Sequence, residues 1–207
     1  MTSGRRLEHF PVKWTPVNLR KCDKQRTRAL SSSSNRVESA LVVRGISRGR
    51  TQGTIELGPL RFACALGRSG RTARKREGDG ATPLGRFRIV GVRYRPDRQR
   101  PRTGLPVQPI GIADGWCDAP ADRNYNRAVR LPYPASHERL WRDDGLYDIV
   151  LVLDHNTRPR MRGAGSAIFM HIARAGLAPT EGCVALPIRQ LERLIARLRP
   201  GACVVVT

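Results

Sequence analysis

The sequence predicts a mainly β domain that carries one amphipathic helix near its C-terminus. From residue 40 onward, short apolar runs rich in β-branched residues alternate with Gly and Pro, which is typical of strands joined by turns. Between Pro187 and Pro200, apolar residues fall at i, i+3, i+4 and i+7, the spacing of a helix with one buried face. Many short strands with a single helix favour a mainly β architecture. The helical spacing is carried by Leu191, Leu194, Ile195 and Leu198.

The expected strands follow one another along the chain with few long gaps. The strand candidates are 41–43, 54–57, 61–66, 87–92, 107–112, 147–153, 166–171 and 203–206. A long loop rich in Arg and Gly is expected over 67–85, where Asp79 and Thr82 are suited to hold turns by local side-chain hydrogen bonds. Residues 113–146 are expected to be irregular. A segment of that length without a regular element usually carries function.

The domain organisation follows from a change in composition near residue 40. Residues 1–39 are basic and polar, contain a run of four serines and show no apolar periodicity, so they predict a disordered N-terminal arm. Residues 40–207 predict one folded domain that is large enough to bury a core. No apolar run is long enough for a transmembrane helix, and the N-terminus lacks the apolar core of an export signal.

The charge of the chain points to anionic partners. The formal net charge is +21, carried mostly by arginine, which attracts nucleic acids, anionic lipids and anionic wall polymers alike. Aromatic residues make up 5% of the chain, and no zinc finger, recognition helix or RNP-like strand is visible. A basic nucleic-acid-binding module is therefore kept as an alternative from another functional class, with no specific nucleic-acid sequence expected.

The cysteines argue for free thiols. There are five of them, at wide spacings and with no C-x-x-C pair, which does not favour a disulfide framework or a zinc site.

The densest chemical signal involves one of these cysteines. His171 ends an apolar strand, and Cys183 follows Gly182 in a polar turn that opens into another apolar segment. An imidazole can take the proton of a nearby thiol, and Gly182 would let backbone N–H groups approach a developing oxyanion.

The segments around these two residues resemble the catalytic domain of the L,D-transpeptidase (YkuD-type) family. The resemblance rests on Ile168-Phe169-Met170-His171 followed by Thr180-Glu181-Gly182-Cys183-Val184. It extends to Arg76–Gly85, to Gly115–Asp118 and to Trp141–Asp148, which are similar to stretches of a compact bacterial subgroup, and so covers roughly residues 40–207. The sequence departs from the commonest pattern at Ile172, Glu181 and Ala185, and the His-to-Cys spacing is short.

The resemblance implies a β-sandwich-like fold and an acyl-transfer reaction without metal or organic cofactor. Cys183 would attack the carbonyl between an L- and a D-centred residue of a peptidoglycan stem tetrapeptide, and His171 would act as the general base and acid. The thioester would pass to an amine acceptor in cell-wall cross-linking or remodelling, or to water, which would make the enzyme an L,D-carboxypeptidase. The substrate class implies a periplasmic or cell-envelope location.

Three further residues are candidates for substrate contact. Arg174 follows the strand of His171 closely and is suited to hold a substrate carboxylate by a bidentate contact. Thr180 belongs to the turn motif, and His155 follows the buried strand 147–153. A papain-like or NlpC-type thiol peptidase is a less favoured alternative, because its cysteine precedes the histidine and opens a helix.

Overall fold

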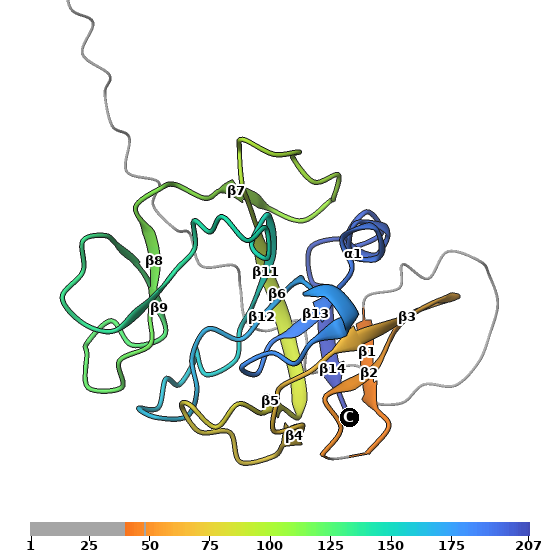
Figure 1. The fold of residues 1–207 in the computed structure, drawn as a ribbon, viewed down its shortest axis with the longest axis horizontal. Helices are drawn as coiled ribbons and strands as arrows, with labels where there is room; N and C mark the ends of the chain where they lie inside the picture. The colour runs from red at the N-terminus through yellow and green to blue at the C-terminus, as the bar shows by residue number, and fades with distance from the viewer. Residues whose placement is uncertain (1–39, 48) are drawn as a thin grey trace, which may run out of the picture. The chain divides into compact units, whose positions relative to one another are not determined.

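The computed structural model describes residues 40–47 and 49–207 (Figure 1). The basic arm expected over residues 1–39 lies outside the described residues. The strands are β1 (Ala40–Gly45), β2 (Gln52–Leu57), β3 (Leu60–Ala65), β4 (Arg71–Thr72), β5 (Thr82–Pro83), β6 (Gly85–Tyr94), β7 (Val107–Pro109), β8 (Asp114–Cys117), β9 (Arg127–Arg130), β10 (His137–Arg139), β11 (Ile149–Leu153), β12 (Phe169–Ile172), β13 (Val184–Leu186) and β14 (Cys203–Val206). A short 3-10 turn, η1 (Ala175–Leu177), and one helix, α1 (Ile188–Ile195), complete the described elements.

Eight strands of the main sheet close into a barrel. They follow the order β11-β12-β13-β3-β2-β1-β14-β6, and β6 pairs with β11 to complete the ring, while β7 extends the sheet beyond β6. The pairs β12–β13, β1–β14 and β6–β7 are parallel, and the other neighbours are antiparallel. Closure pairs the edges that an open sheet would expose. The prediction of a mainly β domain with one C-terminal helix is confirmed, and the sheet that the resemblance implies as sandwich-like is closed into a barrel.

The barrel interior is filled by alternate side chains of its strands. Leu41 and Val43 of β1 and Ile55 and Leu57 of β2 are fully buried, as the period of two in a strand requires. The buried residues of α1 belong to the same apolar cluster, which also includes Leu198 just after the helix. The apolar stripe of this helix therefore gains its burial against the barrel.

The wall formed by β11, β12 and β13 is buried on both faces. All five residues of β11 are buried: Leu151 and Leu153 belong to the interior cluster, whereas Val150 and Val152 belong to a second cluster on the outer face. This second cluster includes Phe169 of β12, and it joins the wall to Trp116 and Leu140 from the region expected to be irregular.

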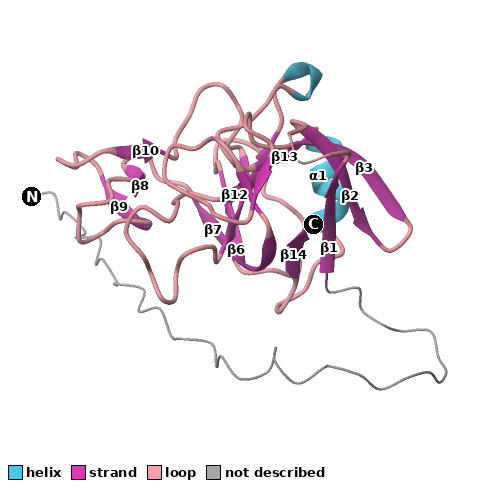
Figure 2. Ribbon diagram, turned by 90° about the horizontal axis from the view of Figure 1, so that it is seen from below, coloured by secondary structure: helices cyan, strands magenta, loops and turns pink. Residues whose placement is uncertain are grey.

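That region folds as a small sheet, and the expectation of an irregular segment is wrong in this respect. Strands β10, β8 and β9 pair in an antiparallel sheet of three, which lies on the opposite side of the domain from β1–β3 (Figure 2). Trp116 of β8 packs edge-on against Phe169 at 5.2 Å between ring centroids. The short strands have no strong pattern of their own and owe their burial to the outer face of the barrel wall. No helix in the described ranges has the length and apolar character needed to span a bilayer.

Candidate active site

The turn that presents Cys183 is held in shape by Thr180. The Thr180 hydroxyl accepts a hydrogen bond from the Gly182 N–H (3.1 Å) and donates one to the carbonyl of Cys183 (2.6 Å). The Thr180 backbone is itself bonded to the chain after β3, through Leu66 (2.9 Å) and Arg68 (2.7 Å). Thr180 is 9% exposed, so these bonds form away from solvent. The turn is thereby fixed before β13 begins.

Gly182 is required by the backbone of this turn. Its φ is +133°, in a region that residues with a side chain rarely adopt. A Cβ at this position would lie 2.9 Å from the carbonyl oxygen of Ala81, too close for a real contact. The close approach expected of Gly182 is therefore present. Its N–H, however, is already bonded to Thr180 and does not face the pocket as a free donor.

His171 and Cys183 line the same pocket on the outer face of the barrel wall. Strands β12 and β13 run parallel, with His171 opposite Ala185, so the residue before β13 lies near the start of β12. The N–H of Phe169 donates to the Cys183 sulfur, and the thiol donates to the carbonyl of Ala167, both at 3.3 Å. Met170 faces the interior, and Phe169 belongs to the outer cluster, so the alternation of β12 puts His171 on the outer face as well.

The orientation of the His171 ring is set by its own backbone. The ring Nδ1 lies 2.8 Å from the carbonyl oxygen of Ile172 and must carry a proton to donate to it. The other nitrogen, Nε2, then holds a lone pair in the neutral ring. The edge of the Tyr147 ring packs against the imidazole at 5.2 Å between centroids, which holds the ring in place.

Burial makes both groups neutral. It raises the pKa of Cys183 to about 12, and the negative charge of Glu138 adds to this rise. It lowers the pKa of His171 to about 4, although the hydrogen bond to Ile172 opposes the shift. A preformed thiolate–imidazolium pair is therefore disfavoured. A nucleophilic attack by this sulfur would therefore require transfer of the thiol proton to a base such as the imidazole.

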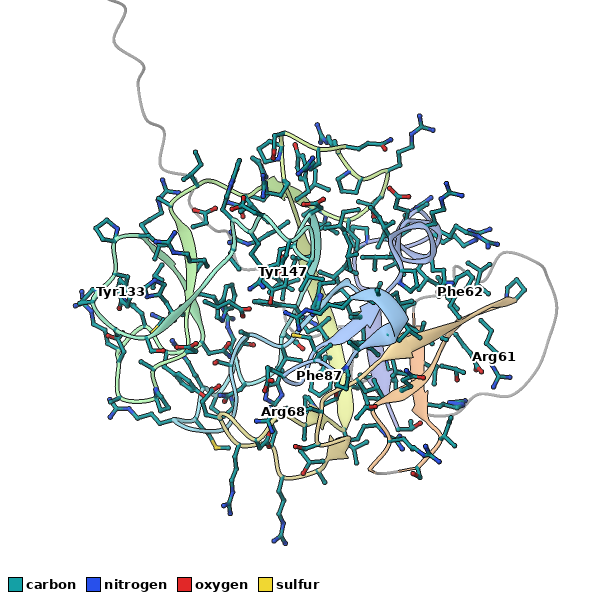
Figure 3. All side chains as sticks on the ribbon, viewed as in Figure 1. Arg61, Phe62, Arg68, Phe87, Tyr133 and Tyr147 are labelled. Carbon is teal, nitrogen blue, oxygen red and sulfur yellow. The ribbon has the colours of Figure 1, made fainter. Side chains whose placement is uncertain are left out.

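A pocket of about 470 Å³ opens over the two residues. Tyr147, Glu138 and Arg142 form one side of it. The Tyr147 hydroxyl donates to Glu138 (2.6 Å), and the Arg142 guanidinium lies over the Tyr147 ring at 5.1 Å. Figure 3 labels Tyr147 in the middle of the view, between the barrel and the three-stranded sheet. Other lining residues include Glu77, Asp118, Ser166, Arg174, Thr180 and Glu181.

The three residues expected to contact substrate, Arg174, Thr180 and His155, have different surroundings in the structure. Arg174 is exposed at the pocket, just before η1. Thr180 also lines the pocket, but its hydroxyl is used inside the turn. His155 lies outside the lining: its ring packs against Phe87 at 5.4 Å between centroids, and its Nε2 lies 2.9 Å from the carbonyl oxygen of Ala164. His155 is therefore not among the residues that line this pocket, and its role in substrate contact stays a prediction.

Sequence reasoning missed a buried cation, Lys75, next to the turn that presents Cys183. The Lys75 side chain is 6% exposed, and its ammonium pairs with Asp79. It lies 3.3 Å from the point that a Cβ on Gly182 would occupy. The Asp79 carboxylate also accepts from the N–H groups of Arg76 (2.8 Å) and Ala81 (2.9 Å), so its expected turn-shaping role is confirmed. The Lys-x-x-x-Asp spacing in a Gly-rich loop was the available signal.

Among the described residues, the other thiols and acids form no comparable site. Cys64, Cys117 and Cys203 are buried. Within residues 40–47 and 49–207, no group of three or more His, Cys, Asp or Glu residues is placed to hold a metal ion. The chemistry available at the pocket is that of a thiol, an imidazole and the surrounding polar groups.

Comparisons with known proteins bear on this pocket. The family described as YkuD, L,D-transpeptidase catalytic domain, matches residues 47–206. Among solved structures, Bd1075 of Bdellovibrio bacteriovorus is similar with 12% sequence identity and a TM-score of 0.42. That match covers 84% of this chain and 50% of the Bdellovibrio chain, so this chain spans about half of that protein. No curated protein matches the sequence.

Proposed function

Because the chain belongs to the YkuD family of L,D-transpeptidase catalytic domains, we propose that it transfers acyl groups of peptidoglycan stem peptides through a thioester on Cys183. The family implies peptidoglycan-modifying activity of the L,D-transpeptidase type, as the resemblance in the sequence predicts. The observation that carries the residue assignment is that Cys183 and His171 line one pocket, with His171 on β12 and Cys183 just before the adjacent parallel strand β13. Membership of this family also implies a location in the cell envelope, where peptidoglycan is found.

Acylation needs one proton transfer in each direction. The Cys183 sulfur attacks the carbonyl carbon between the L- and D-centred residues, and its proton passes to Nε2 of His171. The tetrahedral intermediate collapses with cleavage of the C–N bond, and His171 returns the proton to the leaving D-alanine amine. The bond of Nδ1 to Ile172 keeps the imidazole in the tautomer that this exchange requires.

Deacylation repeats these steps with a second nucleophile. An acceptor amine enters the pocket, gives its proton to His171 and attacks the thioester carbonyl, which restores the Cys183 thiol. Water in place of the amine would give a tripeptide, the L,D-carboxypeptidase reaction. The same residues serve both reactions, so the acceptor decides between them.

The sequence suggests that backbone N–H groups around Cys183 bind the developing oxyanion. Since the Gly182 N–H is bonded to Thr180, the N–H of Cys183 itself is the donor we assign to the developing oxyanion. The Lys75 ammonium behind the turn adds positive charge, which favours the thiolate and the tetrahedral intermediate. Thr180 then acts as a positioning residue rather than as a substrate contact.

Two arginines are suited to the anionic ends of a stem peptide. Arg174 is exposed at the pocket. Arg142 lines the same pocket and is held there by Asp144 and Glu138. A guanidinium can bind a carboxylate through two parallel hydrogen bonds, which would fix the direction of the peptide across Cys183.

The direct test is turnover of disaccharide-tetrapeptides, analysed by mass spectrometry. We expect cross-linked dimers or acceptor-exchanged monomers with the unmodified chain and none with Cys183→Ala. Tripeptide as the sole product would identify water as the acceptor. Absence of every product from a folded chain with a free Cys183 thiol would refute the proposed activity.

A further inference from the structure

A second pocket, distinct from the one over Cys183, is lined by arginines. It has a volume of about 420 Å³. Four guanidinium side chains converge on it from two loops, 118–126 after β8 and 154–168 after β11. We call it the arginine pocket, and its arginines are Arg123, Arg158, Arg160 and Arg162.

These positive charges are only partly offset, because the lining holds four arginines and one carboxylate, that of Asp122. In the described part of the chain, none of the four arginines takes part in a salt bridge. Arg160 donates to the backbone carbonyl of Tyr125 (2.9 Å). Burial lowers the pKa of Arg160, and the nearby charge of Arg127 lowers it further, which reflects repulsion between like charges.

The one acid of the arginine pocket is already engaged. The Asp122 carboxylate accepts hydrogen bonds from the Asn124 N–H (2.6 Å) and from the Tyr133 hydroxyl (2.7 Å). Tyr133 lies at the outer edge of the domain, away from Tyr147 and the Cys183 pocket (Figure 3). The arginine pocket therefore keeps an excess of positive charge. It shares no lining residue with the pocket over Cys183.

We propose that the arginine pocket binds a ligand with a short chain of phosphate groups. Guanidinium forks pair with phosphate oxygens through two charge-assisted hydrogen bonds each, and four forks around one hollow offer donors to several phosphates. Binding would also offset the repulsion between Arg160 and the nearby Arg127. A nucleic acid is a poorer fit, because Tyr125 is the aromatic residue of the lining and is 2% exposed, so its ring offers bases no surface for stacking.

The arginine pocket is connected to the catalytic pocket through Tyr125. The Tyr125 hydroxyl donates to Glu77 (2.5 Å), which lines the pocket over Cys183. A phosphate chain held in the arginine pocket would thus lie on the other side of this tyrosine from the reacting thiol. Phosphate binding itself is independent of acyl transfer, so it can be measured whether or not the proposed reaction occurs.

The test is calorimetric titration of the full chain with tripolyphosphate at low and at physiological salt. The pocket variant Arg158→Gln/Arg162→Gln removes two exposed arginines that make no hydrogen bond to the described residues. The matched control, Arg189→Gln/Arg197→Gln, removes the same charge near α1, outside the pocket. Thermal unfolding of both variants verifies the fold, and the single variants replace the double one if it does not fold.

We expect saturable binding that weakens about tenfold or more in the pocket variant and little in the control. Equal weakening in both variants would mean that net charge alone attracts the anion, and would overturn the proposal. Absence of saturable binding to the unmodified chain would do the same. An oligothymidylate of equal charge is titrated in parallel. If it binds more tightly than tripolyphosphate and depends on Arg158 and Arg162, the partner class is nucleic acid and the phosphate-chain proposal fails.

Discussion

Two buried cysteines, Cys64 on β3 and Cys183 just before β13, allow a comparison between a structural thiol and the proposed nucleophile. Cys64 lies on β3 and faces the barrel interior, and Cys183 lies just before β13 and faces the outer side of the wall. Burial raises the pKa of each thiol to about 12, so the resting protonation state does not distinguish them. The difference lies in access to a pocket and in the neighbouring imidazole of His171. Position in the fold, more than thiol acidity, assigns the reactive role.

Serine substitutions at the two cysteines should give opposite results. Cys183→Ser should reduce muropeptide turnover by about 1,000-fold or more, with little change in the unfolding temperature. Cys64→Ser should leave turnover per folded molecule close to normal. It should lower the free energy of unfolding by about 1–3 kcal/mol, because a hydroxyl is buried in an apolar interior. Loss of turnover in a fully folded Cys64→Ser chain would contradict a purely structural role for Cys64.

The imidazole partner is tested by His171→Asn. This change should slow acyl transfer by about 100- to 10,000-fold, because no group then accepts the thiol proton. His155→Asn is the matched control, since that ring lies outside the catalytic pocket and contacts Phe87. Steady-state turnover should therefore fall strongly in His171→Asn and change little in His155→Asn. Equal losses of turnover in the two variants would contradict the assignment of His171 as the proton acceptor.

Lys75 is expected to tune the Cys183 thiol. The groups that face this thiol are the anions Glu138 and Glu181, the cation Lys75, and the neutral Tyr147 and His171. The positive charge of Lys75 lowers the pKa of Cys183, so Lys75→Met should raise that pKa. Alkylation of Cys183 would then require a higher pH.

The measurement for Lys75 is the pH profile of iodoacetamide labelling at Cys183. Arg74→Met serves as a control that removes a neighbouring exposed charge, and Lys75→Arg should restore most of the wild-type profile. An unchanged profile in a folded Lys75→Met chain would limit Lys75 to a structural role beside Asp79.

A further expected effect is on the free energy of unfolding as a function of pH. The folded chain lowers the pKa of His171 from 6.5 to about 4, so below pH 6.5 the unfolded chain takes up a proton that the folded chain resists. The contribution of His171 is therefore complete above pH 6.5 and is lost as the pH falls toward 4, up to about 3 kcal/mol. Urea unfolding across this range should show a shallower dependence in His171→Asn. A slope identical to that of the unmodified chain would contradict the buried, neutral imidazole.

Local patterns predicted much of this molecule. The spacing of Leu191, Leu194 and Ile195 identified α1, because a helix of this kind is defined by residues close in sequence. The apolar run at β11 and the turn at Gly182 were visible for the same reason. The His171–Cys183 hypothesis rests on two short segments on adjacent strands.

The remainder depends on contacts between distant segments. Barrel closure pairs β6 with β11, about 60 residues apart in the sequence, and no local signal announces it. Strands β8, β9 and β10 are stabilised by the outer face of β11 and β12 rather than by their own pattern. The bond of Tyr147 to Glu138 and the position of Lys75 behind Gly182 arise from the same packing.

The most direct test of the central claim is to trap the acyl-enzyme. The full chain is mixed with a tetrapeptide donor, quenched in acid and digested, and the thiol-containing peptides are examined by mass spectrometry. We predict an added tripeptidyl mass on the peptide that contains Cys183, with the Cys64 and Cys203 peptides unmodified. An adduct on another cysteine, or acyl transfer by the Cys183→Ser variant at the normal rate, would contradict the account.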